Sequence, residues 1–127
     1  MNRLIVVLLA LIAFATPAGT ADPPPFISMI QLIANPEKYQ GKLVAVVGFL
    51  HWETNRLYLS QEDFQHQLVE NSICIERNTD MGKEKDKLNL KYVGVVGIFG
   101  ACRPGMGSFS TGRIARIRSY LIWSREA

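Results

Sequence analysis

The sequence has few of the residues on which most enzyme active sites depend. It contains only two histidines and two cysteines, and neither type forms a cluster with metal-ligand spacing. No serine lies in a G-x-S-x-G elbow, and no G-x-x-x-x-G-K-[ST] phosphate loop occurs. With so few candidate nucleophiles, bases and ligands, we expect a protein that is not an enzyme and that carries no cofactor and no metal ion.

The stretch RPGMGSFSTG, residues 103–112, comes nearest to a phosphate-binding loop. It is rich in glycine, but it has no lysine, and the residues after it alternate as in a strand. Phosphate loops hold the anion at the N-terminus of a helix, so this context excludes a nucleotide site of that kind. The sequence therefore predicts a connecting loop.

His51 and Glu53 form the one pair with catalytic spacing. Two residues apart near the end of a strand, they would share a face and could offer two metal ligands or an acid and a base. No cluster elsewhere supplies a third ligand. We favour two partly exposed residues beside a turn, and keep a metal-assisted hydrolase as the less favoured alternative.

The N-terminus has the three-part pattern of an export signal. Arg3 is followed by an apolar run over 4–15, and small residues lead to Asp22. The run is shorter than the roughly 20 residues that a membrane-spanning helix needs. The pattern predicts a signal peptide over 1–21, no membrane span after its removal, and a mature protein that is periplasmic or secreted.

The remaining chain predicts one mainly β domain with short helices. Residues 22–27 form a proline-rich lead-in, and residues 28–127 a single domain. We expect helices over 29–35, capped by Ser28, and after Ser60. For 78–90 we favour a solvated connector, with one helical turn near 83–88 as the alternative. We expect strands over 41–52, 55–60, 72–77, 91–102 and 112–123, with Tyr58 and Ser72 facing outward and Ala115, Ile117, Leu121 and Trp123 sharing one half-buried face.

Two of the expected strands resemble each other. Residues 42–50 and 91–99 share a lysine, three valines and a glycine at equivalent positions. Since nothing else in the chain repeats, we interpret the likeness as a shared mechanical role: each strand is long and curved, and Gly48 and Gly97 allow the bend. Five strands with two bent ones are what a small OB-like Greek-key barrel requires.

The motifs of these segments resemble those of small exported bacterial proteins with an OB-like barrel. The resemblance covers nearly all of the chain after residue 21, and its most specific part is the lead Asn35-Pro36, Tyr39 and Gly41-Lys42 into the first strand. The chain departs from the pattern in two respects. Its cysteines are not typical of it, and the helix that OB barrels usually have between strands three and four is weak here or replaced by the helix after Ser60. The resemblance implies the fold and export, and no particular reaction.

A ligand face follows from the barrel. In OB barrels the loops between strands one and two and between strands four and five flank the binding surface. Aromatic rings and guanidinium groups there suit a protein, a glycan or another anionic partner; single-stranded nucleic acid is the alternative, which export disfavours. The candidate residues are Trp52, Arg56, Tyr58, Arg103, Phe109, Arg113, Arg116 and Arg118.

Cys74 and Cys102 are the only cysteines. An even number of cysteines in an exported chain permits a disulfide, while two separate packed thiols explain the sequence equally well. Both interpretations stay open at this point, since the sequence does not give the distance between the two residues.

Overall fold

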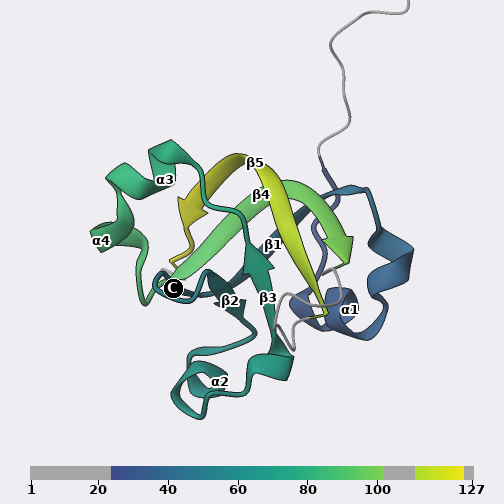
Figure 1. The fold of residues 1–127 in the computed structure, drawn as a ribbon, viewed down its shortest axis with the longest axis horizontal. Helices are drawn as coiled ribbons and strands as arrows, with labels where there is room; N and C mark the ends of the chain where they lie inside the picture. The colour runs from purple at the N-terminus through teal and green to yellow at the C-terminus, as the bar shows by residue number, and fades with distance from the viewer. Residues whose placement is uncertain (1–23, 102–110, 125–127) are drawn as a thin grey trace, which may run out of the picture.

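Five strands close into a barrel in the computed structural model, which describes residues 24–101 and 111–124 (Figure 1). Their order around the barrel is β1-β2-β3-β5-β4, with β4 returning to β1. The pairs are antiparallel except β3 with β5. This mainly β architecture is consistent with the predicted OB-like barrel. The strands are β1 (Leu43–His51), β2 (Arg56–Tyr58), β3 (Ser72–Ile75), β4 (Tyr92–Ala101) and β5 (Gly112–Ile122).

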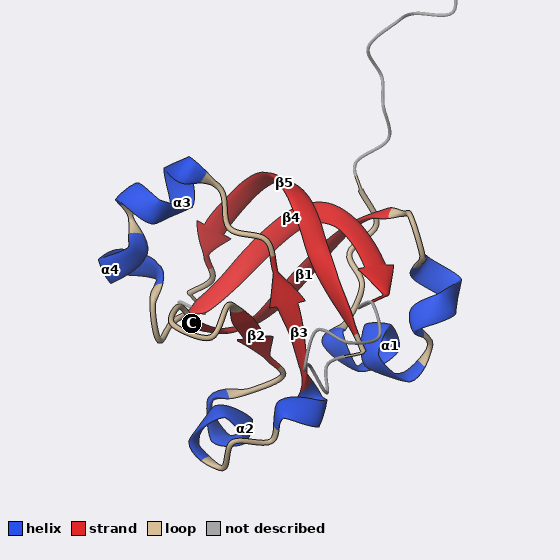
Figure 2. Cartoon of the chain, viewed as in Figure 1, coloured by secondary structure: helices blue, strands red, loops and turns tan. Residues whose placement is uncertain are grey.

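Short helices precede β1 and lie in the connections from β2 to β3 and from β3 to β4 (Figure 2). The predicted caps are confirmed: the Ser28 hydroxyl accepts a hydrogen bond from the Gln31 N–H at 3.2 Å, and the Ser60 hydroxyl accepts one from the Asp63 N–H at 3.1 Å. The elements are α1 (Met29–Ala34), η1 (Pro36–Tyr39), α2 (Gln61–Gln65), η2 (Val69–Asn71), α3 (Thr79–Lys83) and α4 (Lys85–Leu88). Within the described ranges, every helix falls short of the length and apolar character that crossing a membrane demands.

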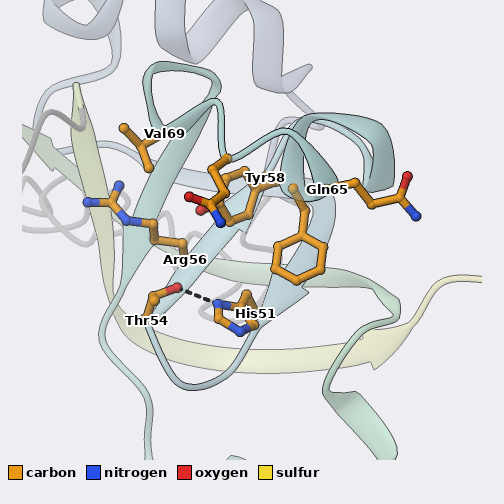
Figure 3. A pocket seen from close by; sticks show the side chains of 8 residues that line it. His51, Thr54, Arg56, Tyr58, Gln65 and Val69 are labelled. Atoms are coloured by element: carbon orange, nitrogen blue, oxygen red, sulfur yellow. Dashed lines mark hydrogen bonds between the residues drawn. The ribbon is translucent and has the colours of Figure 1, made fainter.

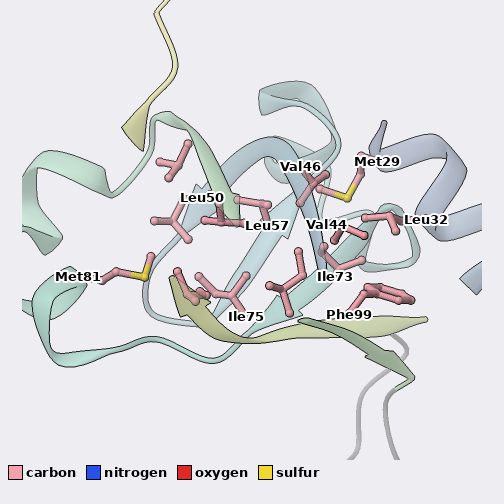
Figure 4. Packing of buried hydrophobic residues seen from close by; sticks show 14 of the residues in the cluster. Met29, Leu32, Val44, Val46, Leu50, Leu57, Ile73, Ile75, Met81 and Phe99 are labelled. Atoms are coloured by element: carbon pink, nitrogen blue, oxygen red, sulfur yellow. The ribbon is translucent and has the colours of Figure 1, made fainter. Parts of the chain in front are cut away.

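The segment 78–90 is largely exposed, as its charges predicted, but it contains two short helices that are anchored in the core. Asn78 caps α3 through its side-chain oxygen, which accepts from the Met81 N–H at 2.8 Å. Met81 and Leu88 are fully buried in the core, so each of the two short helices is held by one apolar side chain (Figure 4). Two short helices, of five and four residues, therefore lie between β3 and β4, so the helix that was expected there to be weak or replaced is present only in short pieces.

The core lies inside the barrel and under α1. Alternate residues of β1 and β4 point inward, as the strand period requires, and α1 adds Met29 and Leu32. The buried residues shared by the strands include Val44, Val46, Leu50, Leu57, Ile73, Ile75, Val93, Val95, Phe99 and Ile114. The inward direction of Ile73 and Ile75 is as predicted.

Gly48 and Gly97 lie where the two similar strands approach their neighbours closely. A Cβ at Gly48 would lie 2.6 Å from Leu57 Cγ, and one at Gly97 would lie 2.5 Å from Ile114 Cγ2 and 2.7 Å from the Ala115 carbonyl oxygen. Real Cβ atoms do not approach that closely. The two glycines thus have a shared role, and close packing is what demands it.

A bulge in β5 changes which residues of that strand are buried. Between the pairs Val96–Ser119 and Ile98–Ala115, β4 advances two residues and β5 four, and Arg116 has a φ of 52°. The predicted simple alternation is therefore wrong: Ile117 is buried, but Leu121 and Trp123 are 55% and 46% exposed.

Replacing Gly97 by alanine should destabilise the barrel. The new methyl group would meet Ile114 and the Ala115 backbone, and overpacking of this kind costs about 1–3 kcal/mol. The free energy of unfolding, measured in urea, checks the prediction. Gly94→Ala in the same strand is the matched control, because its Cβ would meet Val47 at an ordinary 3.6 Å; it should change stability by less than about 0.5 kcal/mol.

Truncating Leu88 should show that α4 belongs to the core. Leu88→Ala removes a side chain that is 1% exposed, which should cost about 2–5 kcal/mol in urea unfolding. The exposed neighbour Lys87 is the control, and Lys87→Ala should cost less than about 0.5 kcal/mol. If both substitutions lowered the free energy of unfolding by the same small amount, Leu88 would not anchor α4 in the core.

Candidate functional site

The register of the barrel places four side chains in one row across its outer wall. His51 of β1 pairs with Arg56 of β2, Arg56 with Cys74 of β3, and Cys74 with Arg113 of β5. The row Phe49, Tyr58 and Ser72 lies beside it. This is the face around β2 and β3 with which OB barrels bind their ligands, and it brings the predicted residues Arg56, Tyr58 and Arg113 onto one wall.

A hollow of about 420 Å³ opens between this wall and α2 (Figure 3). The sheet forms its floor, and the segment from α2 to η2 forms one side. Its lining residues are His51, Thr54, Arg56, Tyr58, Phe64, Gln65, Gln67 and Val69. The hollow therefore combines aromatic rings, amides and hydroxyls with Arg56, which carries the one permanent charge among these residues.

Phe64 holds the aromatic side of the hollow together. Its ring centroid lies 4.8 Å from that of His51, 5.5 Å from that of Phe49 and 5.6 Å from that of Tyr58. Tyr58 is consequently only 4% exposed. The sequence predicted Tyr58 on the outward face; it does occupy an outward position, but α2 covers it, so only its edge contributes to the lining.

Hydrogen bonds orient the polar side of the hollow. The Arg56 guanidinium donates from Nη1 to Ser72 Oγ at 2.9 Å, and Ser72 Oγ donates to the Val69 carbonyl at 2.6 Å. His51 Nδ1 and Thr54 Oγ1 share a hydrogen bond of 2.7 Å (Figure 3). Ser72 occupies an outward position in the register, as predicted, but these groups cover it and it is fully buried. Ser72 thereby holds the Arg56 guanidinium at the hollow, and the Val69 carbonyl holds Ser72 in place.

Trp52 does not join the hollow. Its ring packs against the Arg77 guanidinium at 4.3 Å, and Arg77 Nη1 donates to the Trp52 carbonyl at 2.8 Å. The Trp52 N–H donates to Asn89 Oδ1 at 3.0 Å. One face of the ring is thus covered by Arg77, and the predicted ligand role of Trp52 stays a prediction.

His51 and Glu53 line different hollows. Glu53 borders a smaller one of about 180 Å³ beside Trp52 and α4, whereas His51 faces Phe64. Among residues 24–101 and 111–124, no group of three or more histidine, cysteine or carboxylate side chains is placed to hold a metal ion. The two residues are therefore not brought together as an acid–base or ligand pair.

The remaining candidates lie away from the hollow or outside the described residues. Arg113 approaches Glu76 at 3.9 Å, a partly exposed pair of small energetic weight. Arg116 and Arg118 are exposed at the β5 bulge and do not line the hollow. Arg103, Phe109 and Cys102 fall outside the described residues, so their roles and the disulfide with Cys74 stay predictions.

Sequence reasoning missed the residues that α2 and its continuation supply. Phe64, Gln65, Gln67 and Val69 come from the connection between β2 and β3, which was predicted as a helix without a place on the barrel. The available signal was Phe64, a large apolar residue among polar neighbours. A comparison with protein-family models and with curated proteins finds no match to this chain.

Removing the Arg77 side chain should open the Trp52 ring to solvent. In a Trp123→Phe background, where Trp52 is the sole tryptophan, Arg77→Ala should increase the acrylamide quenching constant of the fluorescence. Arg118→Ala in the same background is the control and should leave the constant unchanged. An unchanged constant in the Arg77 variant would show that the guanidinium does not cover the ring.

Proposed function

We propose that this chain is an exported, non-enzymatic binding module that holds an acidic glycan through the hollow beside β2. The observation that carries the proposal is the position of Arg56, whose permanent charge lies next to aromatic edges and neutral hydrogen-bonding groups in one open-sided hollow. A carboxylate on a sugar would pair with Arg56, and the ring would lie against the aromatic side.

The other lining groups support a sugar. Gln65 and Gln67 offer amides that both donate and accept, and Thr54 offers a hydroxyl beside His51. Sugar hydroxyls need partners of this kind, and the C–H face of a sugar ring would pack on the exposed part of Phe64. A volume of about 420 Å³ suits one or two such rings. The predicted export signal would place the protein where such chains occur.

Calorimetric titration with an oligogalacturonate should detect this binding. Arg56→Gln should weaken it roughly tenfold, because a charge-assisted hydrogen bond is lost. Arg118→Gln removes an equally charged but distant group and should leave the affinity unchanged. Gln65→Glu should also weaken binding, because it adds a negative charge that repels the acidic ligand. It leaves the hydrogen bond between Arg56 and Ser72 in place.

Two outcomes would contradict the proposal. Equal binding of the uncharged oligogalactose would show that the Arg56 charge does not select the ligand. Tight binding of a thymidine oligonucleotide that falls steeply with salt, without binding of the oligogalacturonate, would favour the nucleic-acid alternative. Urea midpoints near that of the unaltered chain would show that the variants remain folded.

A further inference from the structure

The turn between β1 and β2, residues 52–55, lies between the two hollows. Thr54 lines the larger hollow, and its Oγ1 lies 2.7 Å from His51 Nδ1 (Figure 3). Trp52 and Glu53 border the smaller hollow beside α4 instead. The shape of the turn therefore decides whether the Thr54 hydroxyl reaches the histidine.

Backbone hydrogen bonds close this turn and tie it to β3. The Asn55 N–H donates to the Trp52 carbonyl at 3.2 Å, and the Asn55 carbonyl accepts from the Ile75 N–H at 2.8 Å. Asn55 has a φ of 57°, in the left-handed region that asparagine adopts more readily than most residues. The bond to Ile75 brings the chain that follows β3 beside the turn.

Two side chains from outside the turn complete its support at Trp52. Arg77, two residues beyond Ile75, donates from Nη1 to the Trp52 carbonyl at 2.8 Å. The same carbonyl oxygen thus accepts from both Arg77 and Asn55, while the guanidinium covers the indole ring. Asn89, at the end of α4, accepts from the Trp52 N–H at 3.0 Å. Trp52 is therefore fixed at its ring, its carbonyl and its N–H by residues that do not line the larger hollow.

The position of Trp52 affects the chemistry of the hollow through Thr54. Only Glu53 separates Trp52 from Thr54, so a closed turn with a fixed Trp52 leaves Thr54 little freedom. The Thr54 hydroxyl engages His51 Nδ1, and the partner of one ring nitrogen sets which nitrogen carries the proton. A ligand in the hollow can then form a hydrogen bond with His51 only through Nε2, which has a single character, as a donor or as an acceptor.

We propose that Arg77 is a positioning residue for the hollow and acts on His51 through Trp52 and Thr54. It keeps the turn in the shape that aims the Thr54 hydroxyl at Nδ1, so that a ligand meets one tautomer of the imidazole. A site that is organised before binding loses less freedom when the ligand binds, which favours affinity. The effect on affinity rests on the proposed function, whereas the effect on His51 does not.

Nitrogen NMR of His51 tests the positioning and needs no ligand. At about pH 8.5, where histidine side chains are ordinarily neutral, the two ring nitrogens of a single tautomer have well-separated shifts. Arg77→Ala should bring the shifts together, as in a mixture of tautomers, and Thr54→Val should do the same by removing the hydroxyl. Arg77→Lys keeps a cation that can donate to the Trp52 carbonyl and should restore part of the separation. His66, the only other histidine, is the internal reference.

Calorimetric titration with the oligogalacturonate measures the consequence for binding. Arg77→Ala and Thr54→Val should each weaken the affinity roughly threefold, because the hollow is less well organised. Lys85 is the charge-matched control, since it borders the smaller hollow beside Trp52 but does not support the turn. Lys85→Gln should leave both the His51 shifts and the affinity unchanged.

The two measurements separate this proposal from the proposed function. Unchanged His51 shifts in Arg77→Ala or in Thr54→Val would overturn the positioning role, and so would an equal loss of affinity in Lys85→Gln, since charge alone would then explain the effect. Absence of binding by the unaltered chain would contradict the proposed function, while the His51 spectra would still decide the positioning. If urea unfolding showed that Arg77→Ala is not folded, Arg77→Met, which keeps the packing on the ring but has no donor, would replace it.

Discussion

The barrel depends on the close approach of its strands at Gly48 and Gly97. β1 pairs with β4 over 43–49 and with β2 over 49–51, so it must curve while it changes neighbours. At each glycine the space that a side chain would need is occupied by Leu57 or Ile114. A larger residue at either position would therefore disturb the pairing around it. The register decides which residues face outward, and the row from His51 to Arg113 follows from it.

The hollow arises because a short element packs on one part of this wall only. α2 is five residues long and contributes one large apolar side chain, Phe64, which reaches Phe49, His51 and Tyr58. Beyond Phe64 the connection continues through Gln67, at a φ of 55°, into η2. Among the described residues, Arg56 therefore lines the hollow beside this connection. A polar hollow thus forms next to a buried aromatic cluster, and the guanidinium at its floor is held by Ser72.

Local patterns in the sequence predicted the elements, while contacts between distant residues decided the site. Alternating β-branched residues and capping serines depend on neighbours a few positions away, which is why the strands and both caps were correct. The burial of Met81 and Leu88, the β5 bulge and the pairing of Arg77 with Trp52 depend on segments that meet only in the folded chain. Arg56, Tyr58 and Arg113 were placed on one wall because the OB topology orders the strands. The packing of α2 over Tyr58 was not predicted, because the periodicity of the sequence does not show where a short helix packs.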